Sequence, residues 1–228
     1  MKIALVCPAS LPATQFGGIM FLCIDIAKEL AGIGHDVTIY TTDLDFANNA
    51  NTFNKNLPKI EPHNGFIINR SHVWFSYKLF YVNAGMYNQM MKDDFDIIHT
   101  IGIRSFQSLI ATIISKKKKI PLVISDQGGL TTHPDLRRDI VRKILYKLQK
   151  PMLNFIINQA TKIIVANEYE REIFSLTSQK IGVPRDSIIY LDDLEQNVIA
   201  ANEFGFLAYQ IAYSSERVRQ IVKAHGLL

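Results

Sequence analysis

Two adjacent acids near the end of the chain, Asp192 and Asp193, follow a strand-like run, IIYL. Paired carboxylates at the end of a strand can hold Mg²⁺ or carry out acid–base chemistry. Acids at the start of a helix can instead accept unpaired backbone N–H groups and suit the helix dipole. The residue types leave both roles open, a working site and a helix start.

A glycine pair, Gly17 and Gly18, opens a segment with the apolar spacing of an amphipathic helix, 18–34. Glycine lets the backbone come close to a ligand, and the unpaired N–H groups at a helix start favour a phosphate. About nine residues separate Gly17 from the preceding strand-like run, whereas the glycines of the dinucleotide fingerprint GxGxxG follow their strand directly. The pair therefore predicts either a phosphate site of another kind or a tight turn.

Three more polar side chains, His99, Asp126 and Glu168, come at or just after the ends of strand-like runs. Open α/β sheets bind ligands beyond the carboxyl ends of their strands, so these positions are candidate ligand contacts. A histidine there can also be a structural residue whose nitrogens are hydrogen-bonded within the protein. Its place on the strand favours the functional role for His99, with Asp126 and Glu168 as secondary candidates.

The elements that must position these residues alternate along the chain. Continuous apolar runs, typical of parallel strands buried on both faces, predict strands at 2–7, 36–42, 65–70, 95–100, 121–126, 162–167, 187–191 and 206–211. Helical patterns occupy 18–34, 79–93, 103–118, 135–159, 168–180, 193–204 and 214–225. The alternation predicts the α/β class, with a doubly wound, mainly parallel, Rossmann-like sheet of about seven to eight strands.

Three segments have features of their own. The Asn-rich segment 43–64 has few apolar residues and predicts a long loop, which in a compact domain is often functional or mobile. Pro151 lies within the helical pattern 135–159 and is expected to kink or split that helix. The lysine run 116–119 is expected to close a helix and to complement the dipole at its carboxyl end.

Composition sets the broad class. The chain has 228 residues, of which 48% are hydrophobic and 20% charged, as in a soluble globular protein with a core. The net charge of +4 suits anionic ligands but is too small to indicate nucleic-acid binding. Cys7 and Cys23 are predicted to be buried free thiols of a reducing compartment. The first apolar run is too short for a signal peptide, and no apolar stretch could span a membrane, so the cytoplasm is the expected location.

Four motifs stand in an order and spacing found in a known family. They are GGIMFLCIDIAKELAGIGHDVTIYTT at 17–42, FDIIHTIG at 95–102, IPLVISDQGGL at 120–130 and TKIIVANEYEREIF at 161–174. Together they resemble the N-terminal, acceptor-side domain of retaining glycosyltransferases of the GT-B fold, family 4-like, over about residues 1–190. The resemblance implies a hexosyltransferase-type enzyme that uses a nucleotide sugar and a sugar or lipid-linked acceptor, with no cofactor of its own.

The resemblance also implies roles for single residues. Gly17 and Gly18 match the glycine loop that approaches the donor diphosphate and the acceptor, and His99 matches a histidine that points into the cleft, where it would be catalytic. Together with the strand ends, the resemblance implies further substrate contacts at Asp126, Gln127, Gly128, Gly129 and Glu168. The family usually has His-Gly where this chain has Gln127 and Gly128, and an amide hydrogen-bonds without carrying charge.

The helical segment 135–159 combines an apolar stripe with a largely basic remainder. A basic amphipathic helix can lie on an anionic membrane surface, or it can pack on the sheet with its basic face in solvent. The resembling family includes enzymes with lipid-linked or membrane-bound acceptors. Peripheral membrane contact through this helix is therefore an open alternative to packing on the sheet.

The tail, GVPRDSIIYLDDLEQNVIAANEFGFLAYQI, resembles a different family, the haloacid-dehalogenase-like hydrolases. In those enzymes a pair of acids, matched here by Asp192 and Asp193, holds Mg²⁺ opposite a nucleophilic aspartate in a DxDxT motif. The candidate for that motif, Asp43-Leu44-Asp45, lacks the threonine and follows a strand expected to lie far from 187–191. A Mg²⁺-dependent phosphohydrolase is therefore the alternative function, and a helix start is the favoured role of the two acids.

The predicted organisation has two parts. Residues 1–190 form the domain of GT-B N-terminal type, and 191–228 form a helix–strand–helix extension on the same sheet. In the family a donor-binding domain follows the strand at 187–191, and here about 35 residues follow instead. The expectation is a truncated arrangement with weak or no transfer activity unless a separate donor domain pairs with it. A non-catalytic interaction domain is a third possibility.

Overall fold

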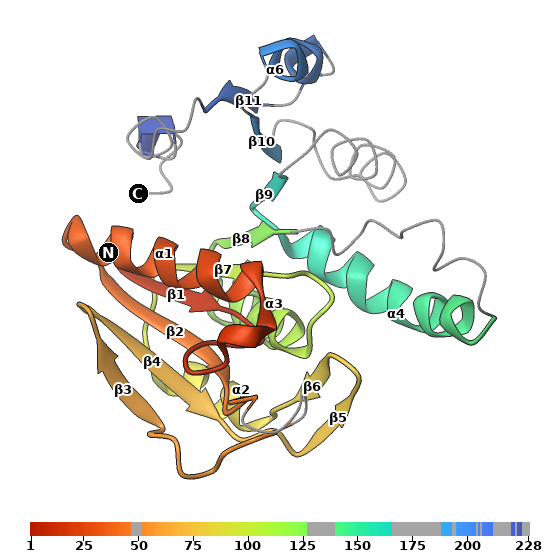
Figure 1. Cartoon of the computed structure of the whole chain (residues 1–228). Helices are drawn as coiled ribbons and strands as arrows, with labels where there is room; N and C mark the ends of the chain where they lie inside the picture. The colour runs from red at the N-terminus through yellow and green to blue at the C-terminus, as the bar shows by residue number, and fades with distance from the viewer. Residues whose placement is uncertain are drawn as a thin grey trace. The chain divides into compact units, whose positions relative to one another are not determined.

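The computed structural model of the chain describes residues 1–46, 52–126, 140–165, 188–192, 195–203, 205, 207–211, 220–221 and 223–224. The chain divides into two compact units, Met1–Leu122 and Val123–Leu228. Figure 1 shows the helices and strands of both units. This division differs from the predicted boundary between 1–190 and the tail 191–228, which stays a prediction.

The first unit is built on a mainly parallel sheet with the strand order β7-β1-β2-β4-β3. The strands are β1 (Lys2–Val6), β2 (Asp36–Thr42), β3 (Ile60–His63), β4 (Phe66–Ser71) and β7 (Ile97–Ile101). All pairs are parallel except β3 with β4, so the carboxyl ends of β1, β2, β4 and β7 lie at one edge. In this register Leu5 of β1 lies opposite both Ile39 and His99.

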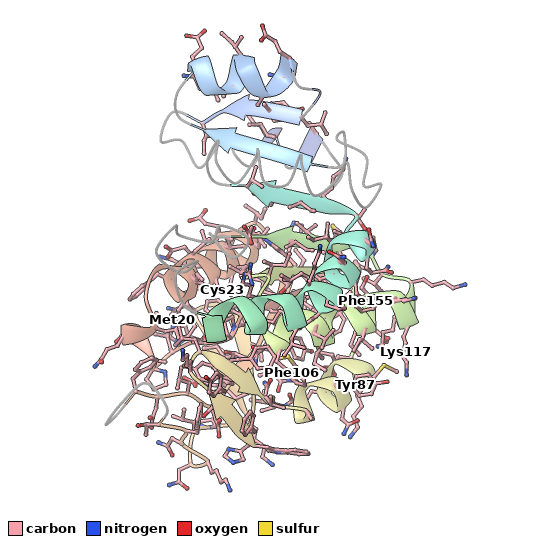
Figure 2. The ribbon with its side chains drawn as sticks, turned by 90° about the vertical axis from the view of Figure 1, so that its right-hand side faces the viewer. Met20, Cys23, Tyr87, Phe106, Lys117 and Phe155 are labelled. Carbon is pink, nitrogen blue, oxygen red and sulfur yellow. The ribbon has the colours of Figure 1, made fainter. Side chains whose placement is uncertain are left out.

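Helices cover both faces of this sheet. Helix α1 (Gly18–Gly32) lies on one face, and α2 (Gly85–Lys92) and α3 (Phe106–Lys118) lie together on the other (Figure 1). The buried side of α1 carries Met20, Cys23 and Ala27 at helical spacing (Figure 2). This arrangement confirms the predicted α/β class and the mainly parallel, Rossmann-like sheet flanked by helices.

The lysine run closes α3 as predicted, because Lys116, Lys117 and Lys118 form its last turn. These lysines do more than face solvent, since two of them contact neighbouring residues. Lys117 Nζ donates to the Tyr87 hydroxyl of α2 at 2.6 Å (Figure 2), and Lys118 Nζ donates to the Asp93 carbonyl. The end of α3 is therefore tied to α2 and to the residue that follows it.

A small hairpin stands apart from the main sheet in hydrogen bonding. Strands β5 (Phe75–Tyr77) and β6 (Phe80–Val82) pair antiparallel, and Lys78 between them has a positive φ of 53°. The ring of Phe80 meets that of Phe106 in α3 edge-on, with 6.2 Å between centroids. The helix predicted over 79–93 is therefore wrong at its start: 80–82 is a strand, and α2 begins only at Gly85.

The segment 43–64, predicted as a long loop, contains regular structure. It ends in strand β3, which pairs with β4 so that Pro62 lies opposite Ile67. An isolated bridge joins Leu44 to Phe53. A proline is tolerated in β3 because this is an edge strand, where one side of the backbone needs no partner.

The second unit carries a parallel sheet in the order β8-β9-β10-β11. Its strands are β8 (Leu122–Ser125), β9 (Lys162–Val165), β10 (Ile188–Asp192) and β11 (Leu207–Gln210), and its helices are α4 (Ile140–Gln159) and α6 (Glu195–Glu203). Helix α4 continues through Pro151, so the chain does not split there as was one expectation. In the ranges described, no helix is long and apolar enough to cross a bilayer. The predicted helix 168–180 lies outside the described residues.

Candidate functional site

The glycine pair lies at the amino end of α1. Gly17 precedes the helix with φ 103° and ψ −161°, a conformation that glycine alone adopts readily. Gly18 is the first helical residue, and a Cβ added there would meet no atom within 4 Å. Within the described residues, no side chain caps α1 and no acid lies in its first turn. The positive end of the helix dipole can therefore accept an anion from outside the protein.

The ends of two strands meet the first turn of α1. The Cys7 thiol, directly after β1, lies 3.9 Å from the Ile19 carbonyl oxygen to which it donates. Gly102, directly after β7, has a φ of 87°, and a Cβ built on it would lie 3.8 Å from Ile19 Cδ1. Cys7 also hydrogen-bonds to Cys23 inside α1, and this bond, together with burial, raises the pKa of Cys23 well above its usual value. The glycine pair is thus held against the carboxyl edge of the sheet.

The loop between β1 and Gly17 is fixed by the neighbouring strands. The Thr42 hydroxyl at the end of β2 donates to the Pro8 carbonyl at 2.7 Å. Nη2 of Arg70, from β4, donates to the Leu11 carbonyl, also at 2.7 Å. Two side chains from the sheet therefore set the path by which the chain reaches the glycine pair.

His99 is the third residue of β7, not its last, because the strand continues to Ile101. Its side chain is partly buried, and this burial lowers its pKa to about 4. The imidazole is therefore neutral near pH 7, where it can donate or accept a hydrogen bond but supplies no positive charge. A role in binding or orienting a substrate hydroxyl suits this state better than charge stabilisation.

The turn from β7 into α3 is held by buried hydroxyl groups. Ser108 Oγ donates to the Gly102 carbonyl at 2.9 Å and lies 2.6 Å from Thr100 Oγ1. Ser105 caps α3, since its Oγ accepts from the Ser108 N–H at 3.0 Å. The backbone beside His99 is therefore positioned by a connected set of hydrogen bonds.

The same edge holds an acid–histidine pair that the sequence reasoning missed. Asp43, after β2, and His72, after β4, approach to 2.5 Å between Oδ2 and Nδ1. Asp43 is buried and also accepts the Val73 N–H through Oδ1 at 3.1 Å, whereas the His72 side chain is 34% exposed. A carboxylate that accepts from Nδ1 requires a proton there, so Nε2 is the nitrogen turned away from the acid. The strand-end rule that selected His99 would have found both residues.

This pair bears on the hydrolase alternative. Both carboxylate oxygens of Asp43 are engaged within the protein, which does not suit a nucleophile facing a metal-bound phosphate. Asp192 is the last residue of β10, and α6 runs from Glu195, so the helix-start role of the two acids stays a prediction. Asp193 lies outside the described residues. In the part of the chain that is described, no group of three histidine, cysteine, aspartate or glutamate residues could hold a metal ion.

The other predicted contacts belong to the second unit or lie outside the described residues, and their roles stay predictions. Asp126 follows β8 in the second unit, is fully buried, and donates its N–H to the Ile164 carbonyl at 3.3 Å. Gln127, Gly128, Gly129 and Glu168 lie outside the described residues. The candidate site is therefore the carboxyl edge of the first unit, formed by the glycine pair, His99 and the Asp43–His72 pair.

Comparison with known proteins identifies the family. A family model described as Glycosyltransferase Family 4 matches residues 16–189, which is more than half of the chain. A search of curated proteins finds no match. The matched range begins one residue before the glycine pair and stops before Asp192, so it gives no support to the hydrolase-like tail. The chain belongs to Glycosyltransferase Family 4.

Proposed function

We propose that this chain takes part in transferring a sugar from a nucleotide sugar to an acceptor, with the carboxyl edge of its first unit as the working site. Family membership supports sugar-containing substrates in general. The observation that carries the finer proposal is the amino end of α1, where two glycines stand and neither a side-chain cap nor an acid is present. A nucleotide sugar presents a diphosphate, the group that such a helix end binds.

Of the two glycines, Gly18 gives the stronger support for a bound ligand. Its backbone is helical and there is room for a Cβ, so neither conformation nor packing requires glycine at this position. Glycine in the middle of a helix is less favourable than alanine by roughly 0.5–1 kcal/mol, and at the first helical position alanine is still at least as favourable. Close approach of a ligand to the backbone explains why the smallest residue stands there.

The remaining partners follow from this proposal. His99, neutral near pH 7, would hydrogen-bond a substrate hydroxyl. His72 would offer its Nε2 to the acceptor molecule. A separate donor-binding domain would complete the binding site for the nucleotide sugar, and the acceptor would be a sugar or a lipid-linked molecule. Peripheral membrane contact through 135–159 belongs to the same proposal, as does a cytoplasmic location. Leu148 of α4 is 71% exposed, which suits that contact.

Alanine substitutions of the two glycines should separate fold from ligand binding. Gly17→Ala should lower the free energy of unfolding by about 1–3 kcal/mol, because a Cβ is strained at φ 103°. Gly18→Ala should leave that free energy unchanged or slightly raised, yet weaken nucleotide-sugar binding by about tenfold or more. Urea unfolding and calorimetric titration with uridine, guanosine and adenosine diphosphate sugars measure the two effects.

Two results would count against the proposal. Binding by Gly18→Ala as tight as that of the unchanged protein would show that the ligand does not approach this backbone. Absence of binding to every nucleotide sugar, also with a family donor domain supplied in trans, would remove the donor from the proposal altogether.

A further inference from the structure

The β5–β6 hairpin and the residue before it expose large apolar side chains. Trp74, Phe75, Tyr77 and Leu79 have 70%, 61%, 48% and 62% of their surface exposed. We call these four residues the hairpin surface. Single exposed apolar residues are ordinary on proteins, but four among six consecutive positions form a patch that marks an interaction site.

The hairpin that carries this surface is anchored from its other side. Tyr81 of β6 is fully buried, and its ring lies 5.4 Å from that of Phe53 between centroids. The Tyr81 carbonyl accepts from Gln107 Nε2 of α3 at 2.9 Å, and the Trp74 N–H donates to the Val82 carbonyl at 2.8 Å. The backbone that carries the exposed side chains is therefore held in place by these contacts.

The sequence that forms the hairpin carries charge of one sign. Lys78 lies in the turn between the two strands, next to Tyr77 and Leu79 in the sequence. From Phe66 to Lys92 the sequence has no aspartate or glutamate. The chain as a whole carries a net charge of +4. A patch with these properties is complementary to an anionic partner surface.

We propose that the hairpin surface inserts into the interface of an anionic lipid membrane. Tryptophan and tyrosine favour the boundary between headgroups and acyl chains, and lysine favours anionic headgroups. A stable protein partner would have to cover about 800 Å² on each side with a matching shape, more than four side chains on a short hairpin offer. A fluid lipid surface needs no matching shape. This contact differs from the one through 135–159 and does not depend on sugar transfer.

The chain carries its own reporter for this test, because Trp74 is its single tryptophan. The full chain is mixed with vesicles of phosphatidylcholine, with and without phosphatidylglycerol. We expect the emission of Trp74 to shift to shorter wavelength and to be quenched by brominated lipid, more strongly when phosphatidylglycerol is present. Co-sedimentation with the vesicles gives the partition coefficient.

Substitutions locate the contact while keeping the reporter. The double variant Phe75→Ser and Leu79→Ser should lower the partition coefficient by about tenfold or more, since it removes two inserting side chains. Lys78→Glu should weaken binding to anionic vesicles more than to neutral ones. Leu148→Ser tests the other proposed contact, through α4. The matched control is Ile60→Ser, which removes one side chain that is 63% exposed, from β3, and should leave partitioning unchanged. Circular dichroism checks that each variant is folded.

Three outcomes would overturn the proposal. One is that the unchanged protein binds neither kind of vesicle. Another is that Leu148→Ser weakens partitioning while the double variant does not, which would assign the membrane contact to α4. The third is that the double variant abolishes self-association seen in analytical ultracentrifugation without lipid and leaves vesicle binding intact, which would make the hairpin surface a contact between copies of the chain.

Discussion

Replacement of Arg70 by methionine is expected to lower the free energy of unfolding by about 3 kcal/mol. The Arg70 side chain is only 3% exposed, and its Nη1 lies 2.6 Å from Glu61 Oε2. Nη1 also donates to the Pro58 carbonyl at 3.0 Å, and Nη2 donates to the Leu11 carbonyl. One side chain thus joins β4, the region of β3 and the loop that leads to the glycine pair. Methionine fills similar space but leaves the carboxylate and both carbonyls without this donor.

Urea unfolding followed by circular dichroism measures the loss, and Glu61→Gln is the matched control. Glu61 is 35% exposed, so water can partly replace its contacts and a smaller loss of about 1 kcal/mol is expected. Arg70→Lys should fall between the two, because it keeps the charge but loses the planar fork. A loss for Arg70→Met no larger than that for Glu61→Gln would show that the guanidinium contacts are not what stabilises this region.

The second large effect is a dependence of stability on pH that comes from His99. Burial lowers its pKa to about 4 in the folded protein, whereas an unfolded histidine titrates near 6.5. Between these values the unfolded state binds the extra proton, so the free energy of unfolding falls as pH falls from about 6.5 to about 4. At about 1.4 kcal/mol per unit, the loss across this window amounts to about 3 kcal/mol. Below about pH 4 both states are protonated and the loss levels off.

The difference between the unchanged protein and His99→Gln isolates this contribution. His35, whose pKa is also lowered by burial, and the carboxylates titrate in both proteins and cancel in the difference. The variant should lose less stability than the unchanged protein when urea unfolding is repeated at pH 7 and pH 5. Nuclear magnetic resonance titration should place the His99 pKa near 4. Equal pH dependence in the two proteins would mean that His99 is not desolvated in the native state.

The strands were predictable because parallel strands buried on both faces need continuous apolar runs, as in β1 and β8. Each of the eight predicted strands has a counterpart in the described residues. The β5–β6 hairpin was not predictable in the same way. From Leu79 onwards its residues have the pattern of an amphipathic helix. The strand β6 forms instead because Phe80 packs on Phe106 and Tyr81 is buried in the folded unit.

The candidate site was predictable only in part. Gly17 and His99 could be selected because a glycine before a helix and a polar residue near a strand end carry local signals. The Asp43–His72 pair joins residues 29 positions apart, and their contact depends on the register of β2 against β4. The lowered pKa of His99 likewise arises from burial in the folded unit, which no local pattern records.

The contact between Cys7 and Cys23 makes the docking of α1 measurable without any substitution. Both thiols are inaccessible, at 0% and 1% exposure, and they are the only cysteines in the chain. A thiol reagent such as a disulfide dye can modify Cys23 only when α1 lifts from the sheet, so the labelling rate reports the free energy of that local opening. A diphosphate bound at the amino end of α1 would hold the helix down and slow the labelling in proportion to its occupancy. Ligands could thus be screened by their protection of Cys23, before any acceptor or product is known.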